Sequence, residues 1–446
     1  MKKLVLLALI ALCSCSAEDS RSLMRPETIA WSKVWGGSLD EISGGMAPTP
    51  DGGLIMVGYT FSQNGDINPA HPNGEMFVQR LDSDGNVLWA KTIGGSQDDY
   101  ATSVIRTRDG NYVLSGFSGS SDGDLSASEG MHDFVICKFT IDGDILWTKN
   151  YGFTSHDHAH KIIELSDGGF FVAGYADYAG IDGTEGDGNN GIGHQMRDGI
   201  TAKHGVGEYL GIRLDRDGNF LWYRYFGGTM NDRVNDIVEA RDGGLIMIGY
   251  SESEDFDASD SKGSYDYWVI KLHSDGGLHW KKSYGGTGID QAFGIARTNH
   301  NSYIIVGRSN SDDKDVKNPK GNFDAWVIHI DDHGKLLWEK SFGGSEYDVA
   351  TTIKRREDGQ FLIAGNTRGN YTGNNKGEND SWLFCIDAHA NTPMHWQRTF
   401  GGQDIDMATE VIENDGAIYL LSDTQSHDGD VPYNRGYNDF WLLKLN

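Results

Sequence analysis

A tryptophan recurs at nearly constant spacing along the chain, and this repeat constrains the fold more than any other feature. The spacings are 58, 58, 75, 58, 58 and 58 residues between Trp31, Trp89, Trp147, Trp222, Trp280, Trp338 and Trp396. Each tryptophan is followed by a copy of the segment that reads KTIGGSQDDYATSVIRTRDGNYVLSGFS at 91–118. A fixed period of this kind is typical of repeat architectures, in which each unit buries its surface against the next.

Each of the first six repeats contains four strand candidates, which in the second repeat are 101–107, 111–117, 133–140 and 144–151. Valine, isoleucine, tyrosine, phenylalanine and tryptophan dominate them, and Asp-Gly turns separate the first pair and the last pair. A sheet of four strands cannot bury both faces alone, but it can do so between two neighbours around an axis. The sequence therefore predicts an all-β fold: a seven-bladed β-propeller of four-stranded antiparallel blades.

The seventh repeat contains only three strand candidates, and its missing strand is expected from the other end of the chain. Residues 27–35, ETIAWSKVW, match the outermost strand DILWTKNYG of the second repeat. Pairing this segment with the last repeat would close the ring and leave no exposed sheet edge. We therefore predict one propeller over residues 27–446, with an insert at 176–207 in blade three.

The first residues have the pattern of a targeting segment rather than of a fold. Lys2 and Lys3 precede a short apolar stretch that is too short to span a bilayer and ends in LCSC. This pattern resembles a lipobox, so we predict a lipoprotein signal peptide at 1–14, an acylated Cys15 and a linker at 15–26. The alternative is an ordinary secretory signal. The expected location is the outer membrane, lipid-anchored and surface-exposed, with a periplasm-facing ring as the alternative.

Charge and cysteine usage limit the partners. The chain has 38 Lys and Arg against 65 Asp and Glu, a formal net charge of −27 that disfavours nucleic acid. Cys137 and Cys385 fall in the second and sixth repeats, which are not neighbours on a ring of seven. Their Cα atoms therefore cannot approach within the roughly 7 Å that a disulfide needs. We expect both to be buried free thiols.

The repeats also carry a family resemblance. WSKVWGGSLDE, WAKTIGGSQDDYATSVIRTRDGNYVLSGFS and SHDGDVPYNRGYNDFWLLKL are similar to the repeats of bacterial seven-bladed β-propeller proteins that are secreted or lipid-anchored at the surface. The resemblance covers about residues 27–446. It implies the propeller fold and a scaffold role, and it implies no shared catalytic set.

An acidic residue recurs ten positions after each tryptophan, at Glu41, Asp99, Asp157, Asp232, Asp290, Asp348 and Asp406. A second acid opens the third strand of each repeat, at Glu75, Asp133, Glu208, Asp266, Asp324, Asp380 and Asp439. Both sets are expected at one end of the ring, with the long loops between second and third strands. A carboxylate there can accept hydrogen bonds from turn amides, so we predict a structural role; repeated cation sites are the alternative.

The third repeat is the richest in histidine. His156, His158 and His160 surround Asp157, and the insert adds His194 and His204. Residues two apart on a strand point the same way, so His158 and His160 are expected on one face. Imidazole suits Zn²⁺, Cu²⁺ or Ni²⁺, and these six residues are our candidate metal ligands. The alternative is a set of solvated loop histidines with one or two buried in the blade interface, because no fixed-spacing metal motif is present.

No nucleophile elbow, Walker loop or dinucleotide fingerprint is present in a strand–helix context. We therefore predict a monomeric binding or interaction scaffold that uses its acidic loop face to bind a carbohydrate or an envelope protein. No cofactor is expected other than the option of a divalent cation. The alternative is a glycan-active or metal-dependent enzyme, with its site over the central channel near the histidines of the third repeat.

Overall fold

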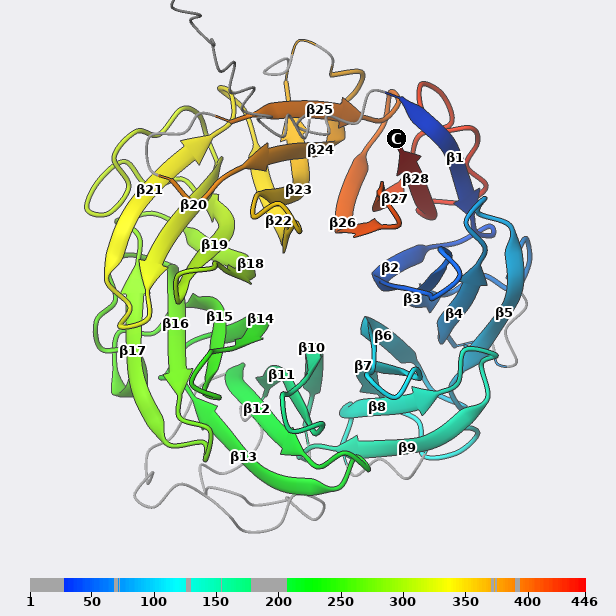
Figure 1. The fold of residues 1–446 in the computed structure, drawn as a ribbon, viewed down its shortest axis with the longest axis horizontal. Coiled ribbons are helices and arrows are strands. Elements are labelled where there is room, and N and C mark those ends of the chain that lie inside the picture. Colours follow the sequence, from blue (N-terminus) through cyan, green and yellow to red (C-terminus); the bar gives the residue numbers. More distant parts are fainter. Residues whose placement is uncertain are drawn as a thin grey trace, which may run out of the picture.

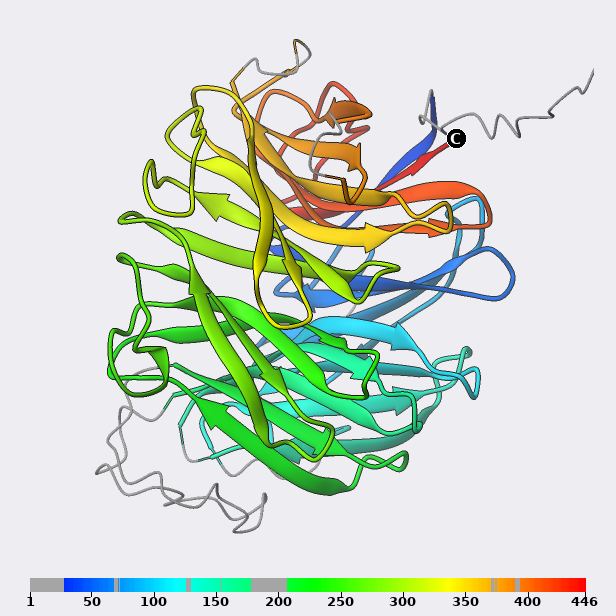
Figure 2. The ribbon, with the colours of Figure 1, turned by 60° about the vertical axis from the view of Figure 1, so that its left-hand side comes forward.

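The computed structural model describes residues 28–67, 71, 73–125, 130–153, 155–177, 207–369, 373, 375–389 and 394–446. Its strands form seven four-stranded antiparallel sheets arranged as blades around a central axis, which confirms the predicted fold (Figure 1). In the view turned by 60° from Figure 1, the blades lie next to one another around the ring (Figure 2).

In blades one to six, the strands follow the chain from the innermost to the outermost position. Blade one consists of β2 (Glu41–Pro48), β3 (Leu54–Thr60), β4 (Glu75–Leu81) and β5 (Val87–Ile93). Blade two consists of β6 (Asp99–Arg106), β7 (Tyr112–Ser118), β8 (Asp133–Phe139) and β9 (Ile145–Tyr151). Blade three consists of β10 (Asp157–Glu164), β11 (Phe170–Ala176), β12 (Glu208–Leu214) and β13 (Phe220–Phe226).

Blade four consists of β14 (Asp232–Glu239), β15 (Leu245–Ser251), β16 (Asp266–Leu272) and β17 (Leu278–Tyr284). Blade five consists of β18 (Asp290–Arg297), β19 (Ser302–Ser309), β20 (Asp324–Asp331) and β21 (Leu336–Phe342). Blade six consists of β22 (Asp348–Arg355), β23 (Phe361–Arg368), β24 (Asn379–Ile386) and β25 (Trp396–Phe400). A 3-10 turn, η1 (Phe256–Ala258), follows β15.

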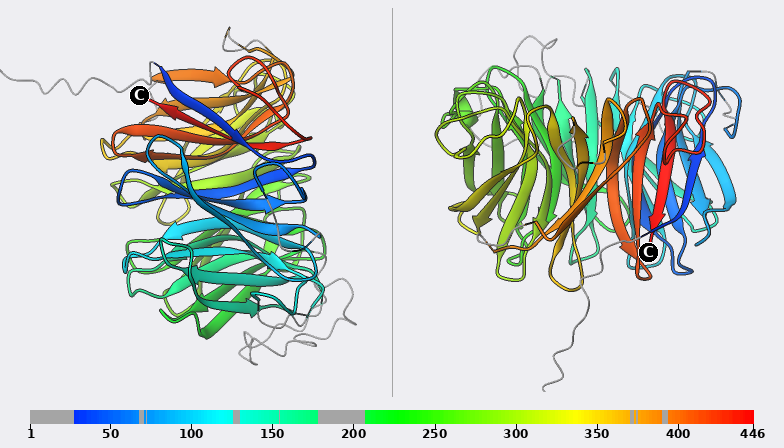
Figure 3. Two further views of the ribbon diagram at one scale, coloured as in Figure 1. Left: turned by 90° about the vertical axis from the view of Figure 1, so that its right-hand side faces the viewer. Right: turned by 90° about the horizontal axis from the view of Figure 1, so that it is seen from above.

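Blade seven joins the two ends of the chain. It consists of β26 (Asp406–Asn414), β27 (Ala417–Thr424), β28 (Asp439–Leu445) and, outermost, β1 (Ile29–Trp35). β1 pairs antiparallel with β28, with Trp35 opposite Phe440 and Ser32 opposite Leu443. The two end strands lie side by side in both views of Figure 3. The predicted closure is confirmed.

Two layers of aromatic residues hold adjacent blades together. The third strands bury Phe77, Trp268, Trp326, Trp382 and Trp441, of which the four tryptophans have no exposed surface. The periodic tryptophans lie on the outer strands, and the indole N–H groups of Trp31, Trp89, Trp280 and Trp338 donate to the outer turn of the next blade. Trp89 Nε1, for example, donates to the Ile141 carbonyl at 3.0 Å, and Trp280 Nε1 donates to the Asp332 carbonyl at 3.0 Å.

Every innermost strand contains a β-bulge three to four residues after its first residue, as between Ala159 and Lys161 in β10. The extra residue has no partner on the second strand, and its side chain can bond the next blade instead. Thr102 Oγ1 donates to the Ala159 carbonyl at 2.7 Å, and Thr351 Oγ1 donates to the Ala408 carbonyl at 2.8 Å. Where the bulge residue is a threonine or an asparagine, as at Thr102, Thr351 and Asn235, it links its blade to the next.

The innermost strands begin at one end of the ring, which also carries the connections between second and third strands; we call this end the loop face. Cys137 and Cys385 are buried free thiols, as predicted. Within the described ranges, no helix combines the length and the apolar character that crossing a bilayer requires.

Candidate metal centre at the loop face

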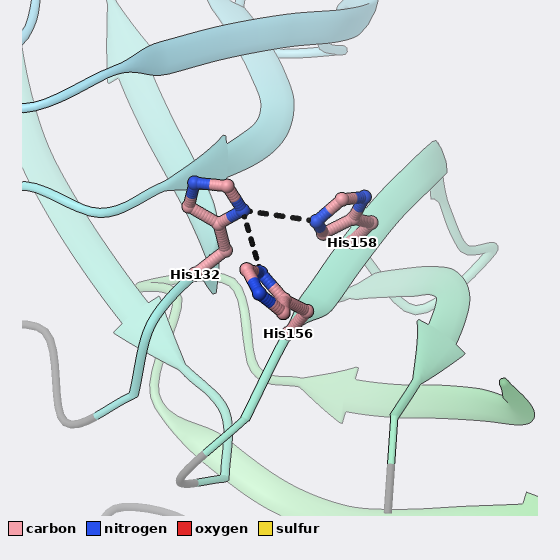
Figure 4. Close-up of side chains that lie close together, drawn as sticks. All are labelled: His132, His156 and His158. Carbon is pink, nitrogen blue, oxygen red and sulfur yellow. Dashed lines mark hydrogen bonds between the residues drawn. The ribbon is translucent and has the colours of Figure 1, made fainter. Parts of the chain in front are cut away.

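Three histidine side chains from two adjacent blades meet at the loop face (Figure 4). His132 immediately precedes β8 of blade two, His156 immediately precedes β10 of blade three, and His158 is the second residue of β10. A parallel bridge joins His132 to His156, and the Asp157 amide donates to the His132 carbonyl at 2.8 Å. Backbone pairing between the blades therefore holds the three imidazoles in place.

The ring nitrogens are spaced as metal ligands would be. His132 Nδ1 lies 3.1 Å from His158 Nε2 and 3.0 Å from His156 Nδ1 (Figure 4). Ligand atoms of all three residues lie within 4.8 Å of one another. A tetrahedral Zn–N bond of about 2.0–2.1 Å gives an N–N edge of about 3.3–3.4 Å. Two edges of the triangle are thus close to the required length.

The outward-facing nitrogens of two histidines also have partners. His132 Nε2 lies 3.2 Å from Asp98 Oδ2, and His158 Nδ1 lies 2.7 Å from the Tyr175 hydroxyl. An N–H on His132 Nε2 donates to the Asp98 carboxylate, which turns the lone pair of Nδ1 toward the other two rings. Metal-binding histidines usually have such outer partners, because these fix the tautomer and the orientation of the ring.

The imidazole of His158 is stacked against an aromatic ring and is neutral. Its ring stacks on Phe117 with a centroid distance of 3.7 Å and an interplanar angle of 2°. Burial, together with the neighbouring histidines and Arg233, lowers the pKa of His158 to about 3. A neutral imidazole is the form that binds a metal, so His158 does not need to lose a proton at neutral pH.

Asp157 and His160, both predicted as ligands, lie elsewhere. Asp157 is buried in the interface of blades two and three, and its carboxylate accepts the Phe153 amide. A methyl group on Gly152 would lie 2.3 Å from Asp133 Oδ1 and 2.8 Å from Asp157 Oδ2, so the two acids enclose this glycine. Burial raises the pKa of Asp157 well above its usual value.

His160 is the bulge residue of β10, so the alternation that predicted a common face for it and His158 does not hold. Its imidazole bonds the Val234 backbone and the Asn235 side chain of blade four. It therefore occupies the place that Thr102 and Thr351 take in other blades. The prediction was wrong because a one-residue bulge breaks the two-residue period of a strand.

His194 and His204 lie outside the described residues, as does Cys15, and their roles stay predictions. His132 was missed by the sequence reasoning, because it belongs to the preceding repeat. A signal was present: His132 and His156 each directly precede a recurrent acid, Asp133 and Asp157. In a propeller these positions of successive repeats are adjacent, as the parallel bridge shows.

The recurrent acids on the innermost strands bind the turns before them. Six of them accept the amide of the residue four positions earlier at 2.6–2.8 Å: Glu41, Asp99, Asp232, Asp290, Asp348 and Asp406. Hydroxyl groups complete the contact, as where Ser253 donates to Asp232 at 2.9 Å. The third-strand acids do the same, as where the Lys376 amide donates to Asp380 at 2.7 Å. Carboxylates of both sets therefore stabilise the turns at the loop face by accepting hydrogen bonds from them.

A cavity of about 1130 Å³ lies at the opposite end of the channel from the histidines. It is lined by the last residues of the innermost strands of several blades, among them Arg106, Lys354 and Glu413. The histidine trio and this cavity are therefore separate features.

No family model matches the chain. A segment of 155 residues is 27% identical to the regulatory protein FlaEY of Caulobacter vibrioides, a match that covers 32% of this chain and 16% of that protein.

Several solved propellers are similar over nearly the whole chain. The polysaccharide lyase Uly1 has a TM-score of 0.51 at 10% identity, covering 97% of this chain and 95% of that one. BamB from Moraxella catarrhalis has a TM-score of 0.40 at 12% identity, covering 94% and 99%. The Pan2 WD40 domain of Neurospora crassa has a TM-score of 0.47 at 11% identity, covering 90% and 89%. The likeness to each is one of fold.

Proposed function

We propose that the protein is a lipid-anchored envelope propeller whose loop face binds a divalent transition-metal ion through His132, His156 and His158. The observation that carries the proposal is the pair of N–N distances, 3.0 and 3.1 Å, close to the edge of a tetrahedral site. The outer partners Asp98 and Tyr175 support it, since they orient two of the rings. The ions that fit are those with an affinity for imidazole, namely Zn²⁺, Cu²⁺ and Ni²⁺.

Within this proposal the protein acts as a binding scaffold, and the metal is part of its recognition surface. Three protein ligands leave a fourth position of a tetrahedral ion open. A hydroxyl or carboxylate of a carbohydrate, or a side chain of an envelope protein, could fill that position. The expected address is the outer surface of the outer membrane, reached through acylation of Cys15.

A metal-dependent or glycan-active enzyme is the second candidate. Its support is the same open position, because catalytic zinc sites also have three protein ligands and a water. The fold is compatible with glycan chemistry, since a polysaccharide lyase is similar to this chain in architecture. Turnover of a polysaccharide that depends on the bound metal would distinguish this enzyme from a scaffold.

The experiment is calorimetric titration of residues 28–446 with Zn²⁺, Cu²⁺ and Ni²⁺. We expect one ion per chain, and His132→Ala or His158→Ala should weaken binding by about 10-fold to 100-fold or more, as loss of a ligand or its support does. His160→Thr and His427→Ala are the matched controls, since His160 faces blade four and His427 is 71% exposed. Both should bind like the parent chain.

Equal affinity of the His132 and His158 variants and the parent would refute the histidine site. Acid should release the metal as the imidazoles become protonated, because only neutral imidazole is a ligand.

A further inference from the structure

Tyrosine and arginine side chains alternate around the loop face beyond the histidines, from blade three to blade five. At the loop-face end of each blade, a residue of the innermost strand pairs with one of the second strand. In blades three, four and five these pairs are His158–Tyr175, Arg233–Tyr250 and Gln291–Arg308. Because the pairs are at equivalent positions of successive blades, they follow one another around the ring. We call Tyr175, Arg233, Tyr250 and Arg308 the Tyr–Arg arc.

Aromatic rings position both guanidinium groups of the arc. Arg233 lies over the Tyr175 ring, 4.2 Å from its centroid. Arg308 lies 5.0 Å from the Phe323 centroid and 5.7 Å from that of Tyr347. Cation–π contact holds a guanidinium in place without neutralising it. Tyr250 pairs with Arg233 in blade four, and Arg308 occupies the position of Tyr250 in blade five.

Neither guanidinium has a carboxylate within 4.0 Å among the residues that the structure describes. Arg308 Nε donates instead to Gln291 Oε1 at 2.9 Å, and its Nη1 donates to the Tyr347 hydroxyl. Some other arginines are paired with carboxylates, as are Arg80 with Asp51 and Arg356 with Glu413. Arg233 and Arg308 are half-buried and contact only neutral groups, although the chain has 65 acidic residues. Their guanidinium groups can therefore bind an anion.

We propose that the Tyr–Arg arc binds an acidic polysaccharide, with a sugar ring against Tyr250 and anionic groups on Arg233 and Arg308. A linear polymer fits because the two cations lie on successive blades. Guanidinium forms paired hydrogen bonds with planar carboxylates, and aromatic faces accept the apolar faces of sugars.

This inference deepens the proposed scaffold function, but it does not depend on the metal. Arg233 and Arg308 are not metal ligands, and the histidine trio belongs to the interface of blades two and three. The two proposals can therefore fail separately. Metal binding without polysaccharide binding would overturn only the arc, and the reverse result would overturn only the histidine site.

The test is affinity measurement on residues 28–446 with polygalacturonate, dextran sulfate and neutral dextran as ligands, with metal chelated. We expect binding to one or both anionic polymers, weakened by added salt, and none to dextran. Arg233→Gln and Arg308→Gln should each weaken binding about tenfold or more, as loss of a charged hydrogen bond does. Arg241→Gln is the control: Arg241 is exposed on the opposite face and donates to the Asn299 carbonyl.

Arg233→Lys and Arg308→Lys separate folding from recognition, since they keep the charge but lose the paired geometry. With melting temperatures near that of the parent, they should bind more weakly than the parent and more tightly than the Gln variants. Preference for polygalacturonate identifies a uronate as the ligand group, and preference for dextran sulfate identifies a sulfate ester. Equal binding of dextran, or full binding by the two Gln variants, would overturn the proposal.

Discussion

Lys161 Nζ lies 3.5 Å from Glu410 Oε2, although these residues belong to blades three and seven, across the channel from each other. Lys354 Nζ of blade six lies 2.8 Å from the other carboxylate oxygen. Burial favours a protonated Glu410, but the two lysines outweigh it and hold the pKa of the carboxyl below its usual value. An ionic link therefore spans the channel between the histidine end and the opposite cavity.

Removing Lys161 should destabilise the ring. Glu410 is only 8% exposed, so Lys161→Met would leave its charge with Lys354 alone. We expect the free energy of unfolding to fall by roughly 1–3 kcal/mol, the usual cost of a lost buried charged partner. Urea unfolding followed by tryptophan fluorescence measures the change. The double variant Lys161→Met/Glu410→Gln should recover part of the loss, and no recovery would show that the two side chains are not coupled.

Stability should depend on pH through the recurrent acids. Burial raises the pKa of Asp99, Asp232, Asp266 and Asp348 to about 6 and that of Asp380 to about 7. A raised carboxyl pKa favours the folded state below the unfolded value near 4, and this stability is lost as the pH rises through 6 to 7. His158, His160 and His329 act oppositely, with pKa values lowered to about 3, 4 and 4.

Because these carboxyls outnumber the lowered histidines, we expect a higher melting temperature at pH 5 than at pH 7.5. Asp380→Asn should reduce the difference, because the amide cannot ionise but can still accept the Lys376 N–H. Asp142→Asn is the control, since this carboxylate is 73% exposed. A melting temperature that rises from pH 5 to pH 7.5 would contradict the assignment of buried, proton-retaining acids.

Ring closure through β1 predicts an effect of N-terminal truncation. Removing residues 16–35 would expose the outer edge of β28, where Ser32 and Lys33 now pair with Leu443 and Leu442. An open hydrophobic edge favours association of chains, so we expect aggregation and a less cooperative thermal transition. Removing residues 16–26 leaves β1 intact and should change neither property. Light scattering during a thermal scan distinguishes the two truncations.

The lipobox-like LCSC predicts that Cys15 is acylated. Cys15→Ala in the full chain should abolish incorporation of labelled palmitate and release the protein from the membrane fraction. Cys13→Ala is the matched control, and it should remain membrane-bound. Continued labelling of the Cys15 variant would remove this cysteine as the anchor. Protease treatment of intact cells then tests whether the ring faces outward.

The number of blades and the way the ring closes can be deduced from the sequence. Both depend on local patterns: Asp-Gly turns between β-branched runs, a tryptophan in each outer strand, and the match of 27–35 to those strands. Such patterns are properties of each repeat and do not depend on how the repeat packs against its neighbours. The free thiols at Cys137 and Cys385 follow as well, because blade number alone separates them.

The composition of the histidine site was decided by tertiary structure. Two of its members, His156 and His158, stand in the histidine-rich repeat, but the third, His132, arrives through pairing between blades. His160 is not part of the site, because a bulge turns its side chain toward blade four. Asp157 is not part of it either, because its carboxylate accepts a hydrogen bond from a buried turn. Contacts such as Lys161–Glu410 depend on the diameter of the channel. They arise from packing between whole blades, which no pattern within one repeat encodes.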